Sequence, residues 1–244
     1  MQLARLALLA ALLAALPATA VLTRPDRDDA EYLELATRYG ACVALASEGE
    51  GVLVAPRWVL TSAWVAKGLQ PLGKAVPPLR FGDGVYEIDS VYGEGELALI
   101  RVRRPVSGVD PIPPYRGSDE ARKALVFVGH GRSGRIGDRT TIADRKTRAA
   151  INTVDRMSAR TFELRVKAPD DASDLQGALA QGEDGACAIL ESGGALFVAG
   201  IALGTERAAA TLAAPGDRDL YARVSAYASW IDAVMLEAAA KEAR

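Results

Sequence analysis

The alternation of apolar and polar residues divides this chain into three regions. An uncharged Leu/Ala run comes first, a strongly charged segment follows from Thr23, and after Gly40 short apolar runs alternate with turns rich in glycine, proline and charged residues. The third pattern is typical of an all-β domain. It predicts strands over residues 41–46, 51–55, 59–62, 79–81, 85–91 and 97–102, and again over 125–128, 139–143, 149–154, 161–166, 187–190 and 195–203.

A proline-rich passage separates the two sets of predicted strands. Pro105, Pro111, Pro113 and Pro114 fall between them, and proline cannot donate a hydrogen bond to a sheet. We therefore expect a first β unit over about 41–104, a connector over 105–120 and a second β unit over about 121–220. A C-terminal helix is predicted over about 225–241, because apolar residues recur there at spacings of three and four: Tyr227, Trp230, Ile231, Val234 and Ala238.

The first twenty residues have the organisation of a secretory signal peptide. One basic residue, Arg5, precedes the apolar run 6–16, and Ala18-Thr19-Ala20 provides a small-x-small cleavage site. A membrane-spanning helix needs roughly 20 apolar residues, more than this run contains. We expect cleavage after Ala20, export to the periplasm or the extracellular space, and no membrane span in the mature chain.

The charged segment 21–40 is expected to form an N-terminal arm that ends in a short helix. Asp28 or Asp29 would cap this helix, and Gly40 would end it.

Composition narrows the classes of function and predicts a disulfide. There are 29 Lys and Arg against 31 Asp and Glu, a formal net charge of −2, and no basic stripe, so no nucleic-acid partner is expected.

The two cysteines are Cys42 and Cys187. In an exported chain an even count favours a bridge over the alternative of two free thiols. Closing so long a loop would stabilise the fold by about 4–5 kcal/mol on the chain-entropy treatment.

Six short segments carry recognisable motifs. In order they are Gly51 to Ala66 with Trp-Val-Leu-Thr-Ser-Ala-Trp, Glu-Leu-Ala-Leu-Ile (96–100), Gly-His-Gly (129–131), Gln-Gly-Glu-Asp-Gly-Ala (181–186), Gly-Ile-Ala-Leu-Gly (200–204) and Tyr-Ala-Arg-Val-Ser-Ala-Tyr (221–227). They resemble the segments of the chymotrypsin-like (trypsin-like) serine peptidases that carry the catalytic histidine, the catalytic aspartate, the opening of the second barrel, the nucleophilic serine, the strand beside the substrate cleft and the start of the C-terminal helix. The resemblance implies an all-β fold of two packed antiparallel six-stranded Greek-key barrels with a C-terminal α-helix, in a domain over 41–235.

The resemblance fails at the three positions that perform catalysis. Trp64 occupies the histidine position, Glu96 the aspartate position and Asp184 the position of the nucleophilic serine. An indole N–H can only donate a hydrogen bond, so it cannot be the general base of the serine mechanism. The resemblance also identifies the backbone N–H groups of Gly182 and Asp184 as oxyanion-binding donors. A fixed carboxylate charge beside them repels an oxyanion.

The resemblance bears on four further residues. Glu183 occupies the place of a carboxylate that pairs with the N-terminal ammonium group in the family, but the family's N-terminal Ile-Val-Gly-Gly has no counterpart in the charged arm. His130, the sole histidine, is interpreted as an incidental polar residue. Cys42 in the first barrel and Cys187 in the second are expected to form a disulfide that clamps the two barrels.

These features favour a catalytically inactive pseudopeptidase that binds a protein or peptide through its cleft or loops, without a cofactor or a metal. One alternative is a hydrolase of another class, in which Glu96 and Asp184, about 5 to 9.5 Å apart, act as a carboxylate pair desolvated by Trp64. A second alternative is a cation site formed by Glu183, Asp184 and Glu96. Calcium takes roughly 6 to 8 oxygen ligands and the sequence shows no ligand loop, so we interpret Glu183 and Asp184 as a solvated turn.

Overall fold

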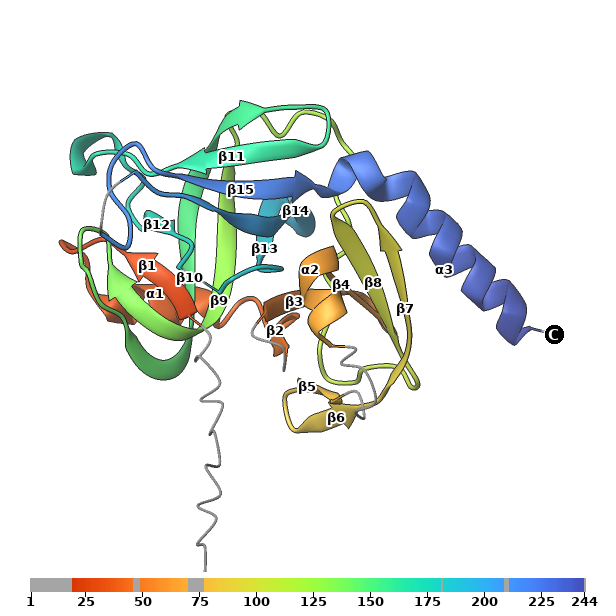
Figure 1. The fold of residues 1–244 in the computed structure, drawn as a ribbon. Coiled ribbons are helices and arrows are strands. Elements are labelled where there is room, and N and C mark those ends of the chain that lie inside the picture. The colour runs from red at the N-terminus through yellow and green to blue at the C-terminus, as the bar shows by residue number, and fades with distance from the viewer. Residues whose placement is uncertain (1–18, 46–48, 70–76, 181, 209–210, 244) are drawn as a thin grey trace, which may run out of the picture.

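A computed structural model of the chain describes residues 19–45, 49–69, 77–180, 182–208 and 211–243. Residues 1–18, which contain most of the predicted signal peptide, and Gln181 of the fourth motif lie outside this part. The described chain forms two halves built mostly from strands, and helix α3 (Ala228–Glu242) extends from the second half past the outside of the first (Figure 1).

The second half closes into a barrel of six strands. Their order is β10-β11-β15-β14-β13-β9, and β9 pairs back with β10. Two short strands, β1 (Thr19–Thr23) and β12 (Gly177–Ala178), extend the same sheet beyond β9. The barrel strands are β9 (Ala124–Arg135), β10 (Ile142–Met157), β11 (Thr161–Arg165), β13 (Cys187–Ser192), β14 (Ala195–Glu206) and β15 (Arg218–Arg223).

The first half contains an antiparallel sheet of five strands in the order β2-β3-β4-β8-β7 and a separate hairpin of β5 and β6. The hairpin turns at Gly82, whose φ of +52° suits glycine in a tight turn. The predicted strand 85–91 is divided at Glu87, whose carbonyl accepts a hydrogen bond from Arg103 (2.9 Å). The strands are β2 (Cys42–Leu45), β3 (Gly49–Ala55), β4 (Trp58–Ser62), β5 (Leu79–Phe81), β6 (Gly84–Tyr86), β7 (Ile88–Glu94) and β8 (Leu97–Val102).

The burial of the strands follows their sequence patterns. In β11 the buried residues Phe162 and Leu164 alternate with partly exposed neighbours, which is the pattern of a strand with one face on the core. In β3 and β4 consecutive residues are buried, so both faces of these strands are covered. Inside the barrel, Phe162 stacks on Tyr221 with ring centroids 5.3 Å apart, a packed aromatic pair of the kind that stabilises a core beyond its buried area.

Strand β10 is longer than the sequence predicts. Residues 139–143 and 149–154 were expected as two strands because the charged residues between them suggested a turn. In the structure β10 begins at Ile142, so residues 139–141 lie before it, and the strand then continues through the charged residues with a bulge, a shift of register against β9 between Ala143 and Lys146. Arg148 is 2% exposed and is paired there with both Asp29 and Asp144. The charges are accommodated because they neutralise one another.

The N-terminal segment is part of the second barrel rather than a separate arm. Strand β1 pairs in parallel with β9 and antiparallel with β12, and Val21 and Leu22 are fully buried. Helix α1 (Asp29–Ala36) begins after Asp28, whose side chain accepts a hydrogen bond from Ala30 and forms a capping box with Glu31. The cap was predicted correctly, but the helix ends at Ala36 rather than at Gly40.

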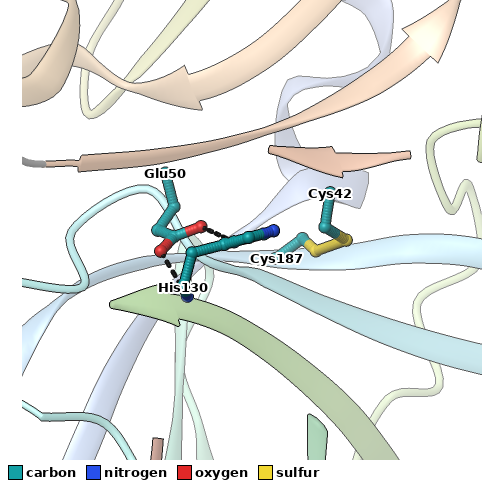
Figure 2. The surroundings of a disulfide bond; sticks show 4 residues. All are labelled: Cys42, Glu50, His130 and Cys187. Carbon is teal, nitrogen blue, oxygen red and sulfur yellow. Dashed lines mark hydrogen bonds and ion pairs between the residues drawn. A yellow bond between two sulfur atoms is a disulfide. The ribbon is translucent and has the colours of Figure 1, made fainter. Parts of the chain in front are cut away.

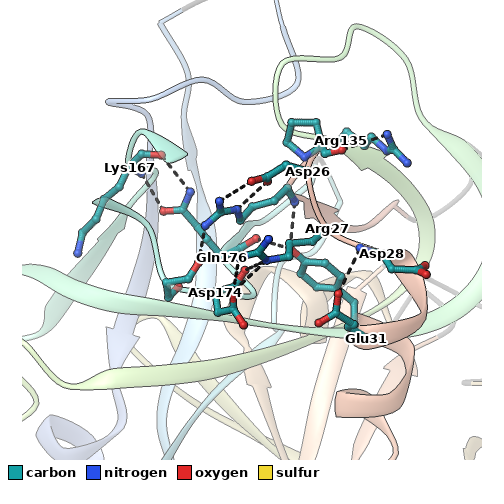
Figure 3. Close-up of polar contacts among 12 residues, drawn as sticks. Asp26, Arg27, Asp28, Glu31, Arg135, Lys167, Asp174 and Gln176 are labelled. Carbon is teal, nitrogen blue, oxygen red and sulfur yellow. Dashed lines mark hydrogen bonds and ion pairs between the residues drawn. The ribbon is translucent and has the colours of Figure 1, made fainter. Parts of the chain in front are cut away.

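Charged and polar side chains fix this segment in place (Figure 3). Arg27 pairs with Asp174 (Nε to Oδ1, 2.9 Å), and the Tyr32 hydroxyl, fully buried, donates to the carbonyl of Gln176 (3.0 Å). Arg24 pairs with Asp26, and this contact lowers the pKa of the Asp26 carboxyl to about 2. The charged and polar side chains of this segment therefore attach it to the barrel.

The helices complete the fold. A 3₁₀ turn, η2 (Val224–Tyr227), precedes α3, and Ile231 and Ala238 of α3 are buried against the core while Trp230 packs beside it. A second 3₁₀ turn, η1 (Pro169–Asp171), lies on the surface. Across the residues that the structure describes, none of the helices combines the length and apolar character needed to cross a membrane.

Candidate functional site

Trp64 lies near the start of α2 (Ala63–Gly68), a short helix that the strand pattern did not predict. The hydroxyl of Ser62 caps this helix by accepting a hydrogen bond from the backbone N–H of Val65 (3.2 Å). The Trp64 side chain is 61% exposed. The indole therefore lies largely on the surface of the molecule.

Glu96 lies in the turn between β7 and β8, directly beside the start of α2. Its backbone carbonyl accepts a hydrogen bond from the N–H of Ala63 (2.8 Å), while its side chain is exposed. The described residues provide no hydrogen bond or ion pair to its carboxylate. Neither Glu96 nor Trp64 is buried, so the desolvation that the carboxylate-pair alternative requires of Trp64 is missing at Glu96.

Asp184 lies in the loop 182–185, which leads into β13. Gly182 and Gly185 have φ of +95° and +87°, a backbone conformation that residues with a side chain rarely adopt. The Asp184 carbonyl accepts a hydrogen bond from the N–H of Glu50 (2.9 Å). Partial burial raises the pKa of the Asp184 carboxyl, and a hydrogen bond from its own backbone N–H opposes this rise. A partly buried carboxyl group therefore occupies the loop whose N–H groups the resemblance identifies as oxyanion donors.

The loop 182–185 and helix α2 meet at Gly49, the first residue of β3. A Cβ atom on Gly49 would lie 2.3 Å from Cγ2 of Val65 and 3.1 Å from the carbonyl oxygen of Asp184. This packing requires glycine because any side chain would collide with both neighbours. The backbone thus brings the segments that carry Trp64, Glu96 and Asp184 to one place.

A pocket of about 260 Å³ opens beside Asp184. One wall is the loop 182–185 and the opposite wall is the second part of β14, so the pocket is narrow and lined by small, apolar and acidic groups. Its lining residues are Leu179, Ala180, Gly182, Glu183, Asp184, Leu203, Gly204 and Thr205.

Glu183 is buried, which corrects the expectation that it forms a solvated turn. It is 1% exposed, its Oε2 accepts a hydrogen bond from the N–H of Ala180 (2.7 Å), and its Oε1 has no hydrogen-bond partner. Burial raises the pKa of the Glu183 carboxyl well above its usual value, and the nearby charge of Glu50 adds to the rise. A carboxyl group in this position requires either a proton or a cation.

His130 is held by Glu50, which corrects its interpretation as an incidental residue (Figure 2). Glu50 is 2% exposed; its Oε1 accepts a hydrogen bond from the backbone N–H of His130 (2.7 Å) and its Oε2 lies 2.6 Å from Nδ1. Sequence reasoning missed this pair. The available signal was a glutamate placed directly before the buried run 51–54, where an unpaired charge would be costly.

Cys42 on β2 and Cys187 on β13 form the expected disulfide, which links the two halves beside Glu50 and His130 (Figure 2). The three carboxylates suggested for a cation, Glu96, Glu183 and Asp184, are not assembled into a ligand set. Within the described part of the chain, no three His, Cys, Asp or Glu side chains are grouped as they would be around a metal ion.

Comparison with known proteins supports the resemblance found in the motifs. The family model described as Trypsin matches residues 35–231, and a search of curated proteins finds no match. The matched range includes the strands from β2 to β15, the segments that carry Trp64, Glu96 and Asp184, and the start of α3. The chain therefore belongs to the trypsin family.

Proposed function

We propose that this protein is an exported pseudopeptidase that does not cleave peptide bonds and binds a peptide or protein segment at the cleft beside Trp64 and Asp184. The proposal rests on one observation above all. A half-buried carboxylate, Asp184, occupies the position of the family's nucleophile. That charge would oppose the negative oxygen that forms during peptide hydrolysis.

The absence of a general base supports the same proposal. Trp64 replaces the imidazole and can only donate a hydrogen bond. The single histidine of the chain, His130, has Nδ1 engaged by the buried Glu50. A serine mechanism needs a hydroxyl nucleophile and an imidazole in contact, and the positions that would supply them carry Asp184 and Trp64.

Ligand binding is supported by the surface that these substitutions create. An exposed indole on α2 lies on the first half, and the pocket beside Asp184 lies on the second. Tryptophan is among the side chains that contribute most to protein interfaces, and the carboxyl of Asp184 offers acceptors to amide or ammonium groups. A peptide segment carries both apolar side chains and N–H donors, so it matches this surface.

The environment of Val21 supports export and processing after Ala20. Val21 is fully buried, and both it and Glu183 crowd Gly129, where a Cβ atom would lie 1.9 Å from Oε1 of Glu183 and 3.3 Å from Cγ2 of Val21. Cleavage after Ala20 would create a new ammonium group at Val21, close to the carboxyl oxygen that has no partner. The chain would then have its own version of the N-terminal ion pair, although it lacks the family's Ile-Val-Gly-Gly.

The purified mature chain is expected to leave casein intact and to remain unlabelled by a fluorophosphonate. Both assays are run beside an active trypsin-like peptidase, which must cleave and be labelled. Hydrolysis by this chain that disappears in Asp184→Asn or Glu96→Gln would show that it is an enzyme.

Peptides selected from a phage-displayed library on the wild-type chain are expected to bind Trp64→Ala about 30-fold more weakly, as for an interface residue worth about 2 kcal/mol. Leu236→Ala is the matched control, since Leu236 is also a large exposed apolar residue (74%) but lies on α3. Equal loss in both variants, or no loss in either, would argue against binding at this cleft.

The exported chain is expected to begin at Val21 by mass spectrometry. Adding Gly-Ser before Val21 should lower the free energy of unfolding by about 3 kcal/mol, because it displaces the ammonium from a buried carboxylate. Glu183→Gln should abolish most of the difference between the two chain starts, and Glu191→Gln, at an exposed ion pair, should not. A different first residue, or equal stability of the two chains, would refute the pairing.

A further inference from the structure

Two neighbouring side-chain links join the same strands of the two halves. On the first half, Cys42 of β2 lies opposite Val52 of β3, and Glu50 lies two positions before Val52. On the second half, Cys187 of β13 lies opposite Val128 of β9, and His130 lies two positions after Val128. Residues two apart on a strand point to the same face. The disulfide and the Glu50–His130 pair therefore bridge the same two surfaces, side by side (Figure 2).

The Glu50–His130 pair holds both the backbone and the side chain of its partner. One carboxylate oxygen of Glu50 binds the N–H of His130, and the other contacts Nδ1. The Glu50 side chain is 3% exposed and the His130 side chain 21%. A buried carboxylate is held more strongly by a charged imidazolium than by a neutral imidazole N–H, although both can donate to it.

Glu50 is also in direct contact with the loop that carries Asp184. Its N–H donates to the carbonyl of Asp184 (2.9 Å), and its carbonyl accepts from the hydroxyl of Thr61 (2.6 Å). A Cβ atom on Gly185 would lie 2.2 Å from the carbonyl oxygen of Glu50. The loop thus packs tightly on the backbone of the residue that binds the histidine.

We propose that the Glu50–His130 pair is a pH-dependent joint between the two halves, and that Glu50 acts through it as a positioning residue for the loop 182–185. With His130 protonated, the pair is an ion pair that reinforces the disulfide. With His130 neutral, its Nδ1–H still donates to Glu50, but the attraction between the two opposite charges is lost, so the contact weakens and the loop that the Glu50 backbone supports gains freedom. This role of the Glu50–His130 pair does not depend on whether the pocket beside Asp184 binds a peptide.

The charged groups around His130 indicate that Glu50 governs the protonation of its imidazole. From β3 comes Glu50, and from the loop before β13 comes the buried Glu183. On β10 the residue opposite His130 is the uncharged Thr147, flanked by Lys146 and Arg148. Arg148 is already neutralised by Asp29 of α1 and Asp144. Glu50 therefore provides the dominant charge at the imidazole.

The direction of the effect follows from these surroundings. Burial lowers the pKa of His130, but the charge of Glu50 and its hydrogen bond raise the pKa more, so the net shift is upward from 6.5. A histidine with a raised pKa contributes stability that is fully present below the pKa of the unfolded chain. That contribution is lost as the pH rises through the folded-state value.

The test is an NMR titration of the disulfide-bonded chain, in which the single histidine gives one unambiguous imidazole resonance. We expect His130 to titrate above 6.5 and the amide resonances of Glu50 and Gly185 to shift with the same midpoint. In Glu50→Gln the midpoint of His130 should fall to 6.5 or below. In His130→Asn the amide shifts at that midpoint should vanish.

Glu191→Gln is the matched control. It removes an exposed ion pair, Arg38 to Glu191 (3.0 Å), that also connects the N-terminal part of the first half to β13, and it should leave all three titrations unchanged. The proposal is overturned if His130 of the wild-type chain titrates at or below 6.5, or if the Glu50 and Gly185 amides do not follow it. The Glu50→Gln variant is needed only to assign the cause, so its misfolding would leave the test intact.

Discussion

Acidic side chains are buried at the junction between the two halves and in the adjoining second barrel, and the structure depends on how these groups are neutralised. Glu50, Glu183 and Asp219 are each at most 2% exposed. Glu50 is paired with His130 and Asp219 with Arg207, while Glu183 has one carboxyl oxygen without a partner. Burial of an unpaired carboxylate is costly enough that it binds a proton or acquires a cation. The disulfide holds the junction together covalently at the same place.

The same junction explains how a trypsin-family chain can keep its backbone while it carries Trp64, Glu96 and Asp184 at the positions that resemble the family's catalytic ones. The close packing at Gly49 and the positive φ angles of Gly182 and Gly185 constrain the backbone, and they do not depend on the side chains at positions 64, 96 and 184. Backbone geometry and catalytic side chains are therefore separable. A carboxylate at position 184 and an exposed indole at position 64 fit this backbone without disturbing the strands, because fold and function depend on different atoms.

Much of the fold could be predicted from local patterns. The alternation of Phe162 and Leu164, the turn at Gly82 and the cap at Asp28 depend on neighbours along the chain, and the structure contains all three. The failures share a different cause. The bulge in β10, the burial of Glu183 and the partner of His130 depend on residues distant in sequence, such as Asp29 and Glu50. A charged residue beside an apolar run is ambiguous until its partner is known.

In the candidate site, too, the sequence predicted which residues are present but not their surroundings. Motif spacing identified Trp64, Glu96 and Asp184, but it could not show that the indole and the Glu96 carboxylate are exposed while Asp184 is half-buried. Short motifs report the identity of residues at known backbone positions. They do not report burial, which depends on the segments that pack around each side chain.

The free energy of unfolding measured between pH 5 and pH 8, with the disulfide intact, tests this account most directly. Burial raises the pKa of Asp219 from 3.8 to about 6, and the pKa values of Asp184 and His130 are also raised. The folded chain therefore binds more protons than the unfolded chain over this range, so its stability should fall as the pH rises. Stability that rises between pH 5 and pH 8 would mean that the acidic junction is not buried as described.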